Sequence, residues 1–87
     1  MTWHFSRDQF ALDLIASLPT EAQFAFFNLL PRLEEDPDAV TRPEGLDVDG
    51  PVRMRSAQLP SAITVLLISD HTGRINLVAV REPPAEA

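Results

Sequence analysis

Cysteine, lysine and tyrosine are all missing from this chain of 87 residues. Without cysteine the chain can form neither a disulfide framework nor a thiolate metal site. It also lacks a long apolar run, and its first residues lack the positive charge and apolar stretch of an export signal. We therefore expect a soluble, cytoplasmic protein that does not enter a membrane and carries no metal or other cofactor.

The charge is unbalanced, because 13 acidic residues face 7 basic residues, all of them arginine, for a net charge of -6. Affinity for nucleic acids comes largely from cations that displace counterions from phosphate, so this overall field opposes non-specific binding to RNA or DNA. Any contact with a polynucleotide must therefore come from a local cluster of arginines.

The first half of the chain predicts a short strand and two helices. Residues 2–6 alternate between apolar and polar side chains, which predicts a half-buried strand that carries Trp3 and Phe5 into the core. Apolar residues then recur at helical spacing over 7–18 and again from 20 to 35, with Pro19 between the two helices. Thr20 and Gln23 have the spacing of a capping box, Phe24 and Phe27 widen the second apolar stripe, and Pro31 predicts a kink.

The second half predicts a loop followed by three strands. Residues 37–51 are rich in Pro, Asp and Gly, and loops of this length are unusual unless they are functional. Alternating or continuous apolar runs predict strands over 52–56, 62–69 and 75–81, the last two joined by a hairpin loop that ends in Gly73. The sequence thus predicts one α+β domain over 1–87: a short N-terminal strand, then a helical hairpin packed on a C-terminal antiparallel β-meander.

Both faces of this meander are expected to be apolar. If Ser69 pairs with Arg74 and the register continues without interruption, one face carries Ile63, Val65, Leu67, Val78 and Val80, and the other carries Leu66, Ile68, Ile75, Leu77 and Ala79. The helical hairpin can cover only one of them, and a large uncovered apolar face usually marks a protein interface. We therefore expect a protein partner or a second copy of the chain on the other face, unless the long loop or the tail folds over it.

Arginines stand out on the predicted strands. Arg53 and Arg55 lie two residues apart, so their guanidinium groups point the same way about 7 Å apart along the strand, a geometry that suits two contacts to one nucleic-acid backbone. Arg81, on the last strand, is placed to join them. The alternative is a solvated strand face on which the arginines pair with the abundant carboxylates.

The order of elements resembles the RelE/ParE toxin superfamily, and so do several short patterns. Over residues 3 to 82 the matching positions are Leu14, Leu18-Pro19, Gln23, Phe27, Leu30, Leu33, Asp36-Pro37, Leu46, Gly50, Arg53-Met54-Arg55 and Ala79-Val80-Arg81. Members of this superfamily are the toxins of bacterial type II toxin–antitoxin systems, and each is neutralised by an antitoxin laid across its surface. Many cleave mRNA on the ribosome and so inhibit translation, whereas a ParE branch inhibits DNA gyrase.

The resemblance implies a ribosome-dependent mRNA endoribonuclease with Arg53, Arg55 and Arg81 as its catalytic and RNA-contacting residues, and with an antitoxin, the ribosome and mRNA as partners. The chain departs from the usual active site, since it has no tyrosine and continues after Arg81 with Glu82-Pro83-Pro84 in place of basic residues and a terminal aromatic. This divergence leaves two alternatives open: a catalytically inactive protein-interaction module of the same fold, and a ParE-like gyrase inhibitor.

Overall fold

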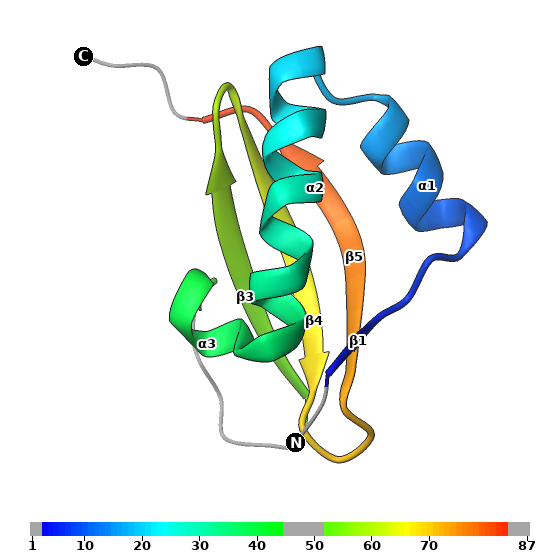
Figure 1. The fold of residues 1–87 in the computed structure, drawn as a ribbon, viewed down its shortest axis with the longest axis vertical. Helices are drawn as coiled ribbons and strands as arrows, with labels where there is room; N and C mark the ends of the chain where they lie inside the picture. The colour runs from blue at the N-terminus through cyan, green and yellow to red at the C-terminus, as the bar shows by residue number, and fades with distance from the viewer. Residues whose placement is uncertain (1–2, 45–51, 84–87) are drawn as a thin grey trace.

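The structure is a computed structural model that describes residues 3–44 and 52–83 (Figure 1). In chain order its elements are β1 (His4–Phe5), α1 (Gln9–Ala16), α2 (Thr20–Glu35), α3 (Pro37–Val40), β2 (Arg42–Pro43), β3 (Val52–Leu59), β4 (Ala62–Ser69) and β5 (Arg74–Arg81). The predicted α+β fold of a helical hairpin on a β-meander is confirmed. The expected loop over 37–51 was wrong in its first part, which forms α3 and β2, and its residues 45–51 lie outside the described part of the chain.

The sheet has five strands in the order β1-β5-β4-β3-β2. Strands β3, β4 and β5 form the predicted antiparallel meander, β2 extends it antiparallel to β3, and β1 lies parallel to β5. Both edge strands are only two residues long, so β2 and β1 pair with only a part of β3 and a part of β5. The central strand β4, by contrast, is paired along nearly its whole length on both sides.

The helix boundaries follow from local hydrogen bonds. The side chain of Asp8 caps α1 by accepting a bond of 2.8 Å from the amide of Ala11. The capping box expected at Thr20 was wrong, because the side-chain Nε2 of Gln23 instead donates to the carbonyl of Leu18 at 2.9 Å. This bond ties the first turn of α2 to the link between the two helices. The second helix continues through Pro31 to Glu35, and Asp36 ends it as predicted.

A bulge in β5 corrects the predicted assignment of side chains to the sheet faces. From Ser69 to Leu66 the register on β5 is the expected one, but Val65 faces Ala79, which leaves Val78 as an extra residue. Beyond this point the faces are exchanged. Val80 packs against the core below the helices, and Ala79 lies on the opposite face, the reverse of the prediction.

The core lies between the helices and one face of the sheet. Its largest fully buried side chains come from α2 (Phe26, Leu33), from β4 (Leu66, Ile68) and from β5 (Ile75, Leu77). Figure 1 shows α1 and α2 side by side over this face. In the described part of the chain no helix covers the other face, which we call the open face; its apolar residues are Val52, Met54, Ile63, Val65, Leu67, Val78 and Ala79.

The turn between β3 and β4 holds a strained residue. Ser61 has a φ of 64°, and its hydroxyl donates to Glu21 at 2.9 Å. A residue with a Cβ in this left-handed conformation costs about 1 kcal/mol or more, whereas glycine adopts it freely. We expect Ser61→Gly to have a free energy of unfolding about 1 kcal/mol higher than Ser61→Ala, since both lose the bond to Glu21 and only alanine keeps the strain. Urea denaturation of the two variants measures this difference, and equal midpoints would contradict the assignment of strain.

Within the described ranges, no helix is both long enough and apolar enough to cross a membrane.

Candidate functional site

Arg53 and Arg55 lie on the helix-facing side of β3. In the sheet they stand opposite Ile68 and Leu66, which are core residues, so both arginines extend beneath the helical layer and away from the open face. Their side chains are only 18% and 11% exposed. The prediction that they share one face is therefore confirmed, but that face is the packed one. We call these two residues the arginine pair.

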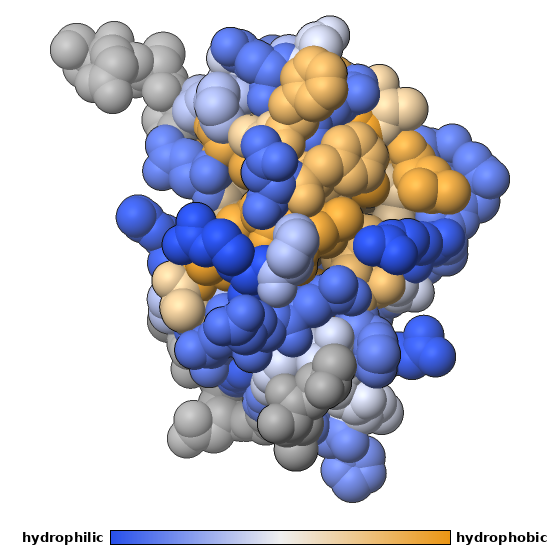
Figure 2. Space-filling model, viewed as in Figure 1, coloured by the Kyte–Doolittle hydropathy of each residue, from blue (hydrophilic) through white to orange (hydrophobic). Residues whose placement is uncertain are grey.

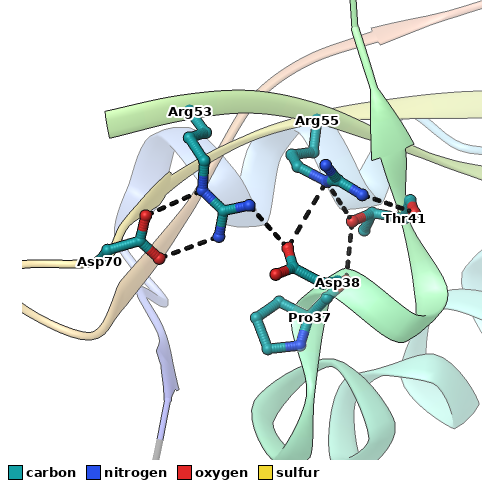
Figure 3. Close-up of polar contacts among 6 residues, drawn as sticks. All are labelled: Pro37, Asp38, Thr41, Arg53, Arg55 and Asp70. Carbon is teal, nitrogen blue, oxygen red and sulfur yellow. Dashed lines mark hydrogen bonds and ion pairs between the residues drawn. The ribbon is translucent and has the colours of Figure 1, made fainter. Parts of the chain in front are cut away.

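One carboxylate oxygen stands between the two guanidinium groups. In Figure 3 the side chain of Asp38 extends from α3 toward the arginine pair on β3. Its Oδ1 atom lies 2.8 Å from Nη1 of Arg53 and 3.7 Å from Nε of Arg55. Two cations converging on one oxygen form an arrangement that also suits a phosphate oxygen.

A second carboxylate completes the contacts of Arg53. Asp70 follows β4 and accepts two hydrogen bonds from Arg53, 2.8 Å from Nε and 2.9 Å from Nη2 (Figure 3). These bonds, and next to them the bond to Asp38, raise the pKa of Arg53 above its ordinary value, so the guanidinium stays charged throughout the accessible pH range. Arg53 thus joins the end of β4 to α3 across β3.

Arg55 attaches α3 to the sheet. It donates from Nε to the Thr41 hydroxyl at 2.9 Å and from Nη2 to the Thr41 carbonyl at 3.0 Å. The same hydroxyl donates to the carbonyl of Pro37 at 2.7 Å, so it closes the short helix at its C-terminal end (Figure 3). Because α3 has only four residues, these bonds to a buried arginine are a main reason for its fixed position.

Arg81 does not join the arginine pair. It faces Ile63 across the sheet and therefore lies on the open face, where it donates two hydrogen bonds to the Glu44 carboxylate, one of them 2.9 Å from Nη2 to Oε1. Glu44 directly follows β2, so this ion pair spans the open face from β5 to the opposite edge of the sheet. The structure thus brings together two of the three arginines expected from the sequence and separates the third.

Within the described ranges, the ionisable groups recorded in contact with the arginine pair are the carboxylates of Asp38 and Asp70. His4 and His71 are exposed. Over residues 3–44 and 52–83 no group of histidine and acidic side chains is arranged to hold a metal ion. The chemical capacity of the site is therefore that of an anion-binding pair of cations, filled at present by Asp38 and Asp70.

The helical hairpin presents an apolar surface that the sequence interpretation missed. Phe24 and Phe27, expected to widen the buried stripe of α2, are 67% and 51% exposed, and Phe10 of α1 is 60% exposed. Figure 2 shows apolar side chains gathered over α1 and the first half of α2 on the outer side of the hairpin. We call Phe10, Phe24 and Phe27 the aromatic face. Helical spacing could have identified it, because Phe24 lies on the side of α2 opposite to Ala22 and Phe26.

The helical hairpin packed on one face of a mixed sheet is a RelE-like fold, as comparison with solved structures shows. The sequence itself matches no protein-family model and no curated protein. Among solved structures, a chain of the archaeal RelE–RelB complex from Pyrococcus horikoshii OT3 superimposes with a TM-score of 0.73 at 16% identity, covering 94% of this chain and 96% of that one. A chain of the toxin–antitoxin complex RelBE2 from Mycobacterium tuberculosis does so with a TM-score of 0.72 at 17% identity, covering 95% and 100%. At this identity the comparison establishes the fold, so the resemblance seen in the sequence is confirmed at that level. Leu46 and Gly50 of that resemblance lie outside the described residues.

Proposed function

We propose that this chain is the toxin-like half of a type II toxin–antitoxin pair and is held by an antitoxin. The observation that carries the proposal is the likeness, over almost the full length of both chains, to chains of two RelE-type complexes, with TM-scores of 0.73 and 0.72. The second of these is described as a toxin–antitoxin complex. A protein that exists as half of such a pair needs an exposed apolar surface for its partner.

The aromatic face is the surface that we assign to the antitoxin. Aromatic side chains dominate binding energy at interfaces, because they bury a large area at a small cost in conformational entropy. Phe24 and Phe27 lie one turn apart on α2, and Phe10 adds a third ring from α1. On the open face, by contrast, Val65 is already buried, and the exposed apolar side chains are Val52 and Met54 at 51% and 44%. The aromatic face therefore offers the larger gain on binding.

Ribosome-dependent cleavage of mRNA is the second candidate function, and the convergence of Arg53 and Arg55 on one oxygen favours it. In this reaction a ribose 2′-oxygen attacks the adjacent phosphate, and negative charge develops on the phosphate oxygens. A phosphate oxygen that took the position of Asp38 Oδ1 would lie between the two guanidinium groups, which would stabilise that charge. The attacking hydroxyl must also lose a proton and the leaving oxygen must gain one, and we assign those two transfers to groups of the ribosome or the RNA.

Expression of the chain alone tests both candidates. We expect growth of the host to stop within a few generations, and we expect full-length mRNA to disappear on Northern blots. Arg53→Ala/Arg55→Ala should restore growth and mRNA, because it removes both cations from the site. Arg7→Ala/Arg74→Ala is the matched control: it removes two exposed arginines elsewhere, and toxicity should persist. Circular dichroism of each purified variant confirms that it is folded.

The other outcomes separate the alternatives. Normal growth at high expression would overturn the toxin proposal and leave an interaction module of the same fold. Growth arrest with intact mRNA would eliminate the nuclease candidate while leaving gyrase inhibition, which a supercoiling assay measures directly. Toxicity that survives loss of the arginine pair would show that this site is not the one responsible.

A further inference from the structure

The outer edge of β3 is paired over only part of its length. Strand β2 faces Ser56 and Arg55, and the amide of Glu44 donates to the Met54 carbonyl at 3.0 Å. Along a strand, the backbone N–H and C=O groups of every second residue point to the same edge. Gln58 therefore directs its N–H and C=O to the outer edge of β3, as Met54 does, but at a position that β2 does not reach. In the described part of the chain neither group has a backbone partner there. One residue of β3 therefore offers an unpaired donor and acceptor side by side.

Three hollows meet at this residue. One lies between α2 and the end of β3, has a volume of about 290 Å³ and is bordered by Asn28 and Arg32. The next lies at the edge itself, between α3, β2 and Ser56, and the third lies on the open face beside Arg42; each has a volume of about 280 Å³. Gln58 borders all three, and we call these three adjoining hollows together the groove.

This groove holds two cations without a counter-charge. Arg53 and Arg81 bind carboxylates, but among the described residues Arg32 and Arg42 form neither a hydrogen bond nor an ion pair through their side chains. Both are exposed, and they border the groove on either side of Gln58. In a chain with a net charge of -6, two unpaired guanidinium groups beside unpaired backbone groups form a local site for an anionic ligand.

We propose that the free edge of β3 binds an extended acidic peptide segment of a partner protein. The peptide backbone pairs with the N–H and C=O of Gln58, and its carboxylates bind Arg32 and Arg42. An unpaired donor and acceptor on a strand edge match a peptide, which offers the same two groups in return. A polynucleotide offers no such repeating pair, and the net negative charge of the chain opposes it. This site uses neither the arginine pair nor the aromatic face, so it stands independently of the proposed function.

A labelled peptide tests the proposal on the intact chain. The probe is a fluorescein-labelled hexapeptide of alternating valine and glutamate, followed by fluorescence anisotropy at low salt. We expect saturable binding that Arg32→Gln and Arg42→Gln each weaken about fivefold, since each removes one charge-assisted contact at a solvated site. Arg74→Gln removes an exposed arginine far from the groove and is the matched control, with an expected change of less than about twofold.

Amide hydrogen exchange tests the backbone pairing separately from the electrostatic contribution of the two arginines. The Gln58 amide should exchange rapidly in the free chain and about tenfold more slowly with saturating peptide, because it becomes a donor in a new strand pair. Absence of binding, unchanged exchange at Gln58, or equal weakening by Arg74→Gln would overturn the proposal. A labelled hexauridylate that binds more tightly than the peptide, with the same response to Arg32→Gln and Arg42→Gln, would overturn it in favour of a polynucleotide site.

Discussion

Replacing Phe24 and Phe27 with serine is expected to weaken antitoxin binding by about 100-fold, while the free energy of unfolding of the isolated chain changes by less than about 1 kcal/mol. Both rings are more than half exposed in the chain, so their removal leaves no cavity in the core. At the interface each ring would pack against the partner, and a loss of about 1.4 kcal/mol per ring, within the range for interface residues that contribute to binding, gives the 100-fold effect for the two together. The measurement is isothermal titration with the product of the neighbouring reading frame, which we expect to encode the antitoxin.

Val52→Ser/Met54→Ser is the matched control for this experiment. It removes two exposed apolar side chains from the open face, of 51% and 44% exposure, and should leave the affinity within about threefold. The opposite result, in which the open-face variant loses binding and the Phe24 and Phe27 variant keeps it, would contradict our assignment of the surface. It would then favour the sheet-face interface that the apolar pattern of the meander first indicated.

The second prediction concerns the carboxylates that fill the arginine pair. We expect Asp38→Asn/Asp70→Asn to bind a labelled hexauridylate about tenfold more tightly at low salt, because two negative charges leave a site that holds two cations. The same change should lower the free energy of unfolding by about 1 kcal/mol, since solvated ion pairs are weak individually and Arg53 loses both of its partners. Anisotropy titrations and urea denaturation measure the two effects.

Asp13→Asn/Glu82→Gln provides the control, because it removes the same amount of charge from two exposed positions, on α1 and after β5, outside the elements that carry the arginine pair and its carboxylates. Its affinity for hexauridylate should rise by less than about twofold, because charges far from the bound RNA are largely screened by salt. Equal gains in the two double variants would mean that the arginine pair is not an anion site. A gain confined to Asp38→Asn/Asp70→Asn would support the role of Arg53 and Arg55 as phosphate-binding residues.

The elements of this fold were predictable where periodicity is local. Strand β4 is a continuous apolar run, and its residues 62–69 form the strand as expected. The turn that follows ends in Gly73, whose φ of 71° is the conformation that glycine adopts freely. The relation between Arg53 and Arg55 was equally accessible, because two residues separated by one position on a strand must share a face.

Other features depend on contacts that a single strand or helix does not reveal. The bulge at Val78 exchanged the faces of Val80 and Ala79, and nothing in the alternation of β5 marks the extra residue. The burial of Arg55 depends on Thr41 and Asp38, which belong to a four-residue helix in a segment read as a loop. Gln23 had the spacing of a helix cap, yet its side chain bonds the carbonyl of Leu18, before the helix. In the last two cases a contact outside the element itself decided the local outcome.

The parallel pairing of β1 with β5 has a consequence for the order in which the contacts of the sheet form. It joins His4 and Phe5 to Arg74 and Ile75, so the pairing closes a loop that contains the helices α1, α2 and α3 and the strands β3 and β4. Contacts between residues so far apart in the sequence cost the most loop-closure entropy and form late in folding. Before they form, the contact of β1 with α2, through the bond of 3.0 Å from the Phe5 backbone amide to the Glu34 carboxylate, is the shorter-range one.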